Sequence, residues 1–250
     1  MDGFDEQIRV RLDAPFAACR PFVAGWYRPT APFLTHSAVY GLLLNIAGIE
    51  SRRWEHEKDH DGKTPASLTR DGLPAIRLAI GLPDGVDDPP RVETVYQQLH
   101  NYPVGTSGMP PELAKGTKNN ITPVRREILC GVKAVLAVAC DSAFAERLRN
   151  GLRGEPTGRT YGLPFLGDNN FLLDRLEETA PTAARWYERL DPAARPRPHT
   201  ARLTLRVDRA GMAETDSALF APSDNASNEP SPGAWAELPS GGVGQNDGSL

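Results

Sequence analysis

The sequence predicts an α+β domain built around an antiparallel sheet. Two observations favour this class. Several segments alternate apolar and polar residues, as strands with one buried face do, and others space their apolar residues as helices do. The 250 residues are 40% hydrophobic, which is enough for one large domain or two small ones with a real core.

The first predicted elements are a strand and a helix. Apolar and charged residues alternate over residues 8–13, which predicts a strand with one buried face. A helix is predicted over residues 35–48, because its apolar residues share one helical face. Either Thr35 or Ser37 can cap the start of this helix, and Gly48 suits its end.

Strands dominate the middle of the chain. The same alternation predicts a second strand over residues 76–82, and residues 92–99 are a candidate for a third. Residues 124–140 are rich in Val, Ala and Leu and are expected to return as one or two strands. Asp141 can then cap a short helix that ends near Gly151.

Three shorter elements complete the predicted core. A short helix is expected at residues 171–176, and Pro181 can open another that continues to Leu190. Residues 203–207 alternate again and predict the last strand. The order strand, helix, strand, strand, long excursion, strand, helix fits a ferredoxin-like (RNA-recognition-motif-like) antiparallel sheet with helices.

The domain is expected to cover residues 1–220, with an insertion and an excursion inside it and a tail after it. Residues 50–72 are highly charged without periodicity and are interpreted as an exposed insertion. Residues 100–122 hold several Gly, Pro, Lys and Asn and predict a long excursion with a β-hairpin tip. In residues 221–250, 17 of 30 positions are Gly, Pro, Ser or Asn, which predicts a disordered tail.

The charge of the chain neither indicates nor excludes nucleic-acid binding. The formal net charge is −4, from 28 basic and 32 acidic residues. Four of the acidic residues and none of the basic ones lie in residues 221–250, so residues 1–220 carry 28 of each sign. A binding surface for an anion must therefore come from local segregation of charge.

Several classes of protein are disfavoured by what the sequence lacks. No run of eighteen apolar residues is present, and the acidic N-terminus does not resemble a secretory signal. The three cysteines lack CxxC spacing and fit reduced thiols in a cytoplasmic protein. Phosphate-binding, dinucleotide-binding and serine-hydrolase motifs are missing too, and no cofactor is expected.

One metal-binding motif is present but has an unsuitable context. Residues His56-Glu57-Lys58-Asp59-His60 match the HExxH pattern, in which two histidines on a helix bind zinc. That helix normally lies among apolar residues, whereas here Glu55, Asp61 and Gly62 flank the motif. We interpret the segment as a solvated charged loop and expect no metal site.

The remaining histidines leave one catalytic alternative open. His100 lies near Tyr96, Tyr102 and Lys115, and such a set could cleave RNA through its 2′-hydroxyl by general acid–base chemistry. Isolated histidines are more often ordinary surface or core residues.

Two segments carry residues suited to RNA. Lys and Arg neutralise phosphates, and Asn or exposed backbone amides bond phosphates or base edges. In the excursion and just after it, the candidate RNA-binding residues are Lys115, Lys118, Asn119, Asn120, Arg125 and Arg126. Charge alone equally allows a solvated hairpin there.

The second segment is the Gly-rich loop, residues 158–171. Its glycines let the backbone come close to a ligand, and an aromatic ring can stack on a base. The candidates in this loop are Arg159, Tyr161, Gly162, Gly167, Asn169 and Asn170. The alternative is a structural loop that packs Leu163, Phe165 and Leu166 into the core.

The order and spacing of four fragments resemble the Cas-five family of CRISPR-associated RAMP proteins, over roughly residues 6–210. The fragments are the strand 8–13, the stretch Pro29–Pro32 leading into the helix 37–43, the stretch 123–129, and the stretch 161–172. The last fragment resembles a type I-B-like subtype.

This resemblance implies a role in guide-RNA binding. It implies a ferredoxin-like domain whose residues 100–122 form a β-hairpin thumb. The domain would bind the crRNA 5′ handle, pack against the Cas-seven backbone subunit and the large subunit, and lie near target DNA at the PAM. The resemblance also places His36, Ser37 and Tyr40 at the end of the first helix, facing the handle or a partner.

The resemblance implies a subunit without catalysis. One branch of the family cleaves precursor crRNA with a set that includes an adjacent Lys-His pair, and this sequence has no such pair. We therefore expect a non-catalytic subunit of a type I CRISPR surveillance (Cascade) complex that acts in the cytoplasm, away from membranes. Two alternatives stay open: a metal-independent endoribonuclease that processes precursor crRNA, and a structural partner-binding domain without RNA contact.

Overall fold

The computed structural model describes residues 4–21, 26–52, 69–103, 119–158, 163–193, 195–207 and 215–239. For residues 99–103 and 119–122 it describes the backbone only. The HExxH motif, Lys115, Lys118, Arg159, Tyr161 and Gly162 lie outside the described residues. No helix in the described ranges is both long enough and apolar enough to cross a membrane.

Ten strands and two α-helices make up the described fold. The elements in chain order are β1 (Glu6–Ala17), β2 (Tyr27–Arg28), α1 (His36–Ile46), β3 (Ile76–Pro83), β4 (Arg91–Pro103), β5 (Asn119–Cys140), α2 (Ser142–Leu152), β6 (Arg175–Glu178), β7 (Ala184–Arg189), β8 (Ala201–Arg206), β9 (Asp216–Pro222), a short 3-10 helix (Pro232–Ala234) and β10 (Ala236–Leu238).

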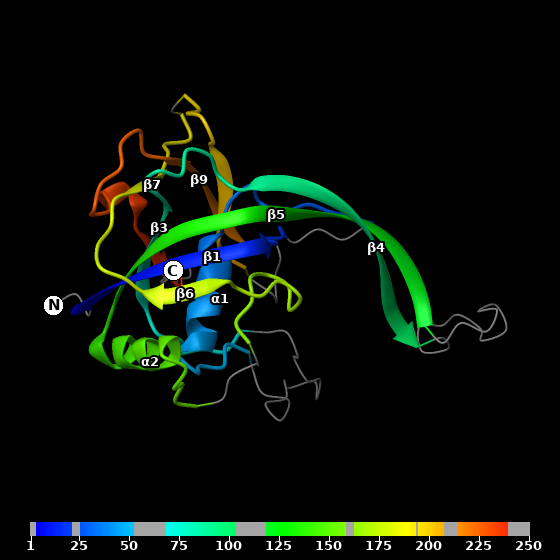
Figure 1. Cartoon of the computed structure of the whole chain (residues 1–250), viewed down its shortest axis with the longest axis horizontal. Coiled ribbons are helices and arrows are strands. Elements are labelled where there is room, and N and C mark those ends of the chain that lie inside the picture. The colour runs from blue at the N-terminus through cyan, green and yellow to red at the C-terminus, as the bar shows by residue number, and fades with distance from the viewer. Residues whose placement is uncertain are drawn as a thin grey trace, which may run out of the picture.

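The strands form one curled sheet with the order β6-β1-β5-β3-β7-β9-β8 (Figure 1). β10 pairs with β3, while β2 and β4 both pair with β5. Neighbouring strands are antiparallel, apart from the short parallel pair of β2 with β5. α1 contacts β3 and α2. Because the sheet curls, α1 also contacts β8 at the far end of the sheet. The α+β class with an antiparallel sheet is therefore confirmed.

The most prominent feature is a long two-stranded ribbon that leaves the body of the molecule (Figure 1). We call β4 together with the part of β5 that pairs with it, from Asn119 to Cys130, the ribbon. The rest of β5 lies inside the sheet between β1 and β3. The predicted excursion is thus bounded by two paired strands, and residues 104–118 lie outside the described part.

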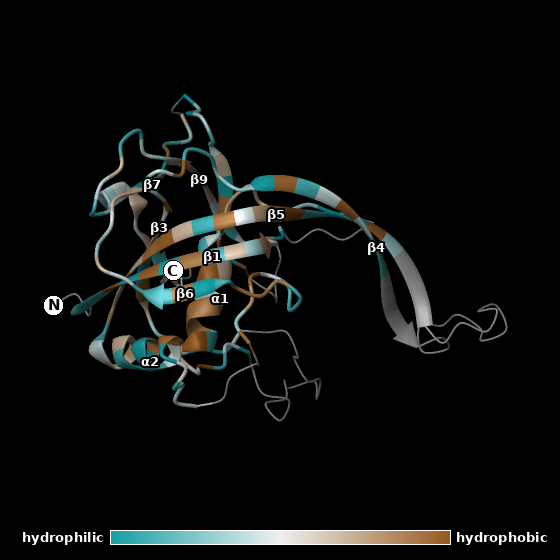
Figure 2. Ribbon diagram, in the orientation of Figure 1, coloured by the Kyte–Doolittle hydropathy of each residue, from teal (hydrophilic) through white to brown (hydrophobic). Residues whose placement is uncertain are grey.

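The predicted helix starts follow local capping rules. The Thr35 side chain accepts a hydrogen bond from the Ala38 amide, so Thr35 rather than Ser37 caps α1. Asp141 caps α2 by accepting from the Phe144 amide at 2.7 Å, as the sequence predicted. Figure 2 shows hydrophobic residues along α1, β1 and the central part of β5, where the core lies, and hydrophilic residues on β6.

Two predicted helices are not formed. At residues 171–176, Leu172 makes an isolated bridge with Phe165 and β6 starts at Arg175. The helix expected from Pro181 to Leu190 gives way to β7. Trp186 of β7 packs over Gly81 of β3, where a Cβ would lie only 2.9 Å from the Trp186 ring. Strand pairing and this close aromatic packing override the helix-start signal of Pro181, because tertiary contacts outweigh local propensity.

The prediction of a disordered tail is wrong for residues 221–239. This segment ends β9, forms the 3-10 helix and adds β10 to the edge of β3. Polar contacts hold it: Glu229 pairs with the buried Arg9 at 2.6 Å, and the Trp186 indole donates to the Ser227 carbonyl at 2.9 Å. Composition misled the prediction, because a segment with few apolar residues can be ordered by hydrogen bonds to a preformed sheet edge. Residues 240–250 lie outside the described part.

The ends of the charged insertion meet on the body of the molecule. Arg52 and Thr69 form an isolated antiparallel bridge, and the Arg70 amide donates to the Ser51 carbonyl at 3.0 Å. Residues 53–68 between them lie outside the described part.

Candidate nucleic-acid interface

The Gly-rich loop packs against the end of β1 at the root of the ribbon. The Ala18 amide donates to the Leu166 carbonyl at 3.2 Å, and the Leu166 side chain is fully buried. Gly167 has φ +75°, and a Cβ there would lie 1.7 Å from the Ala18 carbonyl oxygen. Only glycine fits this left-handed position at such a close approach. The candidate Gly167 therefore fixes the position of the loop.

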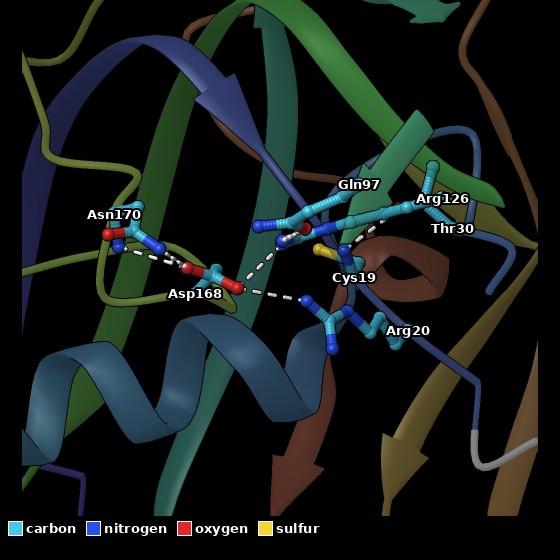
Figure 3. A network of polar contacts seen from close by, with 7 residues as sticks. All are labelled: Cys19, Arg20, Thr30, Gln97, Arg126, Asp168 and Asn170. Carbon is cyan, nitrogen blue, oxygen red and sulfur yellow. Dashed lines mark hydrogen bonds and ion pairs between the residues drawn. The ribbon is translucent and has the colours of Figure 1, made fainter. Parts of the chain in front are cut away.

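Asp168 joins the loop to the ribbon through Arg126 and to the segment after β1 through Arg20 (Figure 3). One of its oxygens accepts from Arg126 at 2.6 Å and from Arg20 at 2.9 Å. Its other oxygen accepts from the backbone and side-chain nitrogens of Asn170, at 3.0 and 2.9 Å. Burial opposes ionisation of Asp168, but the Asn170 amide and the Arg126 guanidinium outweigh it and lower the pKa of the carboxyl. The carboxylate is therefore the stable form.

Arg126 lies on the inner face of the ribbon. The residue is 4% exposed, and its guanidinium also donates to Gln97 of β4 at 3.1 Å. The same group lies 4.8 Å over the ring of Phe171, at the end of the Gly-rich loop. The prediction that Arg126 contacts phosphate is corrected, because its charge is already bound to Asp168 and sealed from solvent. Arg126 instead holds the loop and the ribbon together.

Arg125, the neighbour of Arg126, lies on the opposite, outer face and is exposed. Its backbone amide donates to the Trp26 carbonyl at 2.7 Å, which ties the segment containing β2 to the ribbon. The structure therefore separates two arginines that the sequence treated alike. Arg125 is the one available to an anionic ligand.

Glu127 anchors β2 beside Arg125. Its carboxylate accepts from the Tyr27 hydroxyl and, at 3.0 Å, from the Thr30 amide. The hydrogen bond to Glu127 raises the pKa of Tyr27. Thr30 in turn accepts from the Cys19 amide at 2.9 Å (Figure 3), so the chain after β1 is tied to the ribbon.

Two predicted site residues belong to the core instead. His36 has no exposed surface and lies against Phe220 with ring centroids 4.7 Å apart, and burial lowers its pKa to about 3. Tyr40 is buried and donates to the Pro74 carbonyl at 2.7 Å, and burial raises the pKa of its hydroxyl. The expectation that they face RNA or a partner is corrected, because both side chains point into the interior of the curled sheet.

The remaining candidates divide by their place in the fold. Asn169 and Asn170 are exposed on the Gly-rich loop, and Asn170 is partly used by Asp168. Asn119 and Asn120 begin β5 on the ribbon, where only the backbone is described. Within the described residues, no three His, Cys, Asp or Glu side chains gather in a way that could hold a metal ion.

The sequence analysis did not identify the residues that form this junction, because they are far apart in the sequence. Arg20, Gln97 and Asp168 meet although Arg20 and Asp168 are 148 positions apart. No local pattern could have paired them. The exposed aromatic residues Trp26 and Tyr27 were missed too, and Tyr96 was considered only beside His100 as part of a catalytic alternative.

Comparisons with known proteins identify the fold only. No family model and no curated protein sequence matches this chain. A chain of a solved structure described as a CRISPR RNA-guided surveillance complex is similar over 92% of this chain and 96% of its own length, with a TM-score of 0.51 and 15% identity. A solved structure described as a crystal structure of a Cas protein covers 88% of this chain and 96% of its own, with a TM-score of 0.41 and 14% identity. The chain thus shares the fold of the first of these.

Proposed function

We propose that this chain is a non-catalytic subunit of a type I CRISPR surveillance complex and that it holds the 5′ handle of the guide RNA. The observation that carries the proposal is the junction of ribbon and Gly-rich loop, fixed by Asp168, in a chain with the fold of a component of a CRISPR RNA-guided surveillance complex. The junction offers an exposed arginine on the outer face of a ribbon whose inner face is fixed to the loop. Such preorganisation lowers the entropic cost of binding an extended ligand.

The arrangement of the core supports the ferredoxin-like part of this proposal. With the short β2 and the ribbon strand β4 set aside, the first elements follow the order β1-α1-β3-β5-α2-β6, and their strands lie in the order β6-β1-β5-β3. A β-α-β-β-α-β unit with an antiparallel sheet is the pattern that we propose for the RNA-binding core. The ribbon would be the thumb inserted between β3 and the central part of β5.

The outer face of the ribbon is the part of the junction that we assign to RNA. Arg125 is exposed there, while the exposed Asn169 and Asn170 lie on the loop that is held to the inner face and could contact RNA at the base of the ribbon. Exposed arginine and amide groups bind phosphates and base edges. We further propose that the complex works in the cytoplasm, with the Cas-seven subunit and the large subunit as neighbours and target DNA near the PAM.

A matched pair of arginine variants tests the RNA assignment. Arg125→Ala should weaken capture of guide RNA and make the slope of log affinity against log salt shallower by about one phosphate contact. Arg202→Ala is the control, because Arg202 is exposed on β8, far along the sheet from the ribbon. Each variant is co-expressed with the neighbouring genes, the complex is purified, and the bound RNA is quantified at several salt concentrations. Equal RNA affinity and slope in the two variants would remove Arg125 from the site.

The two other functions give different outcomes in the same preparation. An endoribonuclease that uses Tyr96 and His100 would release cut precursor RNA without a metal ion, and Tyr96→Phe would abolish the cut. A purely structural subunit would assemble in full while contacting no RNA.

A further inference from the structure

A row of three side chains crosses the root of the ribbon on its outer face. Tyr27 of β2 pairs with Arg125 of β5, and Arg125 pairs with Tyr96 of β4. Residues in register on neighbouring strands project to the same face of a sheet. Arg125 therefore lies between the two tyrosines, and we call these three residues the aromatic row.

The aromatic row is unusually open to solvent. Tyr96 is 71% exposed and Tyr27 is 41% exposed. Trp26, next to the row, is 60% exposed, with its ring centroid 6.5 Å from that of Tyr27. These are three of the four exposed aromatic side chains in the described part of the chain. Single exposed apolar residues are ordinary, but a cluster at one place indicates a binding surface.

The row is held in place before any ligand arrives. The Tyr27 hydroxyl donates to Glu127, and the other oxygen of that carboxylate accepts from the Thr30 amide. Beneath the row, on the inner face, Arg126 is fixed by Asp168, Gln97 and Phe171. A ligand on the outer face therefore meets an anchored Tyr27 ring on a fixed stretch of backbone, which lowers the entropic cost of binding.

The row offers several rings but a single cation. Arg125 can contact one phosphate, and the Glu127 carboxylate on the same face disfavours a second phosphate beside it, so the rest of the row suits bases. Flat rings with a guanidinium between them are suited to stacking on nucleobases, as aromatic residues on the sheets of single-strand RNA-binding domains do. The immediate neighbours of Tyr96 on this face of β4 are Thr94 and Gln98, which are exposed and polar, and the apolar Val92 lies one position beyond Thr94. Polar neighbours differ from the apolar centre of a protein interface.

We propose that the aromatic row stacks unpaired nucleobases of single-stranded RNA, with Tyr27 and Tyr96 receiving different bases. Two strand spacings separate the tyrosines, about 10 Å, which is too far for both rings to hold one base. The proposal rests on the proposed function and adds its mode of recognition: base faces read by π-stacking, without dependence on base identity.

The test compares variants of Tyr96, whose exposure makes misfolding an unimportant outcome. The full chain is titrated with a fluorescent single-stranded RNA that carries the guide 5′ sequence. Tyr96→Ala should weaken binding about tenfold through loss of one stacked base, whereas Tyr96→Phe, which keeps the ring, should stay within about twofold of the wild type. The salt slope should be the same in both, because stacking releases no counterions.

Distinct results separate failure of the row from failure of the function. Wild-type affinity in Tyr96→Ala, with guide RNA still bound, overturns base stacking and leaves the proposed function standing. A wild-type chain that binds no RNA, alone or in the complex, overturns both. A Tyr96→Ala chain that binds RNA normally but no longer joins the complex assigns the row to a protein partner, which also overturns the proposal.

Discussion

Arg125 and Arg126 are adjacent in sequence and lie on opposite faces of the same ribbon. Arg126 is buried, paired with Asp168 and packed over Phe171, whereas Arg125 is exposed between two tyrosines. On the inner face, the ion pair of Arg126 with Asp168 holds the loop and the ribbon together. On the outer face, the Arg125 side chain is exposed. Identical side chains thus differ in role because strand alternation sends one to a carboxylate and the other to solvent.

The largest expected difference between the two faces is in stability. Arg126→Ala leaves Asp168 with Arg20 as its one arginine partner and leaves Gln97 without this donor, so the free energy of unfolding should fall by about 3–5 kcal/mol. Arg125→Ala removes an exposed side chain and should cost less than about 0.5 kcal/mol. Urea denaturation of both variants measures the difference, and similar losses would contradict the contrast between the faces.

The next largest effect concerns the loop that the inner face holds. Gly167→Ala should lower the free energy of unfolding by about 3 kcal/mol, since it combines backbone strain with a clash at Ala18. Gly154→Ala is the matched control, because Gly154 has a similar φ of +82° and open space around it. The control should cost about 1 kcal/mol from backbone strain alone. Equal costs would mean that the loop does not need its contact with β1.

His36 is buried without a hydrogen-bond partner, whereas Arg126 is buried with several. We therefore expect His36 to make the stability of the fold depend on pH. Both ring nitrogens of His36 lack hydrogen bonds, and burial lowers its pKa to about 3 from an ordinary 6.5. Below pH 6.5 the unfolded chain takes up a proton that the folded chain refuses. Stability is therefore lost as the pH falls from 6.5 toward 3, at up to about 1.4 kcal/mol per pH unit.

A variant without the imidazole isolates this effect. His36→Leu should be more stable than the wild type, and the gap should widen as the pH falls below 6.5. Thermal melts of the two proteins at matched pH values give the gap. A gap that stays constant from pH 7 to pH 4 would refute the assignment of acid sensitivity to His36.

The smallest expected effect is on the anchoring of the outer face. Tyr27→Phe removes the hydrogen bond to Glu127 but keeps the ring, so it should cost less than about 1 kcal/mol of stability. RNA affinity should fall only slightly, because the ring still stacks. A loss of affinity as large as that of Tyr96→Ala would show that the phenol hydroxyl, rather than the ring, makes the contact.

The sequence allowed the prediction of those features whose cause is local. Alternation placed β1 and β3, and the caps at Thr35 and Asp141 follow from their own neighbours in sequence. The ordered segment 221–239 and the strand β7 escaped prediction, because distant sheet edges and Gly81 determine them.

The candidate site divides in the same way. Sequence patterns pointed to the ribbon and to the Gly-rich loop, and Gly167 does occupy a position that demands glycine. They could not reveal that Asp168 binds Arg126, 42 positions away, or that His36 turns inward. Residue type indicates what a side chain can bind. The fold decides whether that side chain is already bound within the protein, as Arg126 is by Asp168.

The most direct test of the central claim is a map of RNA crosslinks to this chain. The chain is expressed with its genomic neighbours, the complex is purified and irradiated, and crosslinked peptides are identified together with the RNA joined to them. We expect peptides from residues 91–103, 119–130 or 163–171 joined to one fixed short sequence at the 5′ end of the guide. Abundant complex in which this chain carries no RNA crosslink would contradict the account.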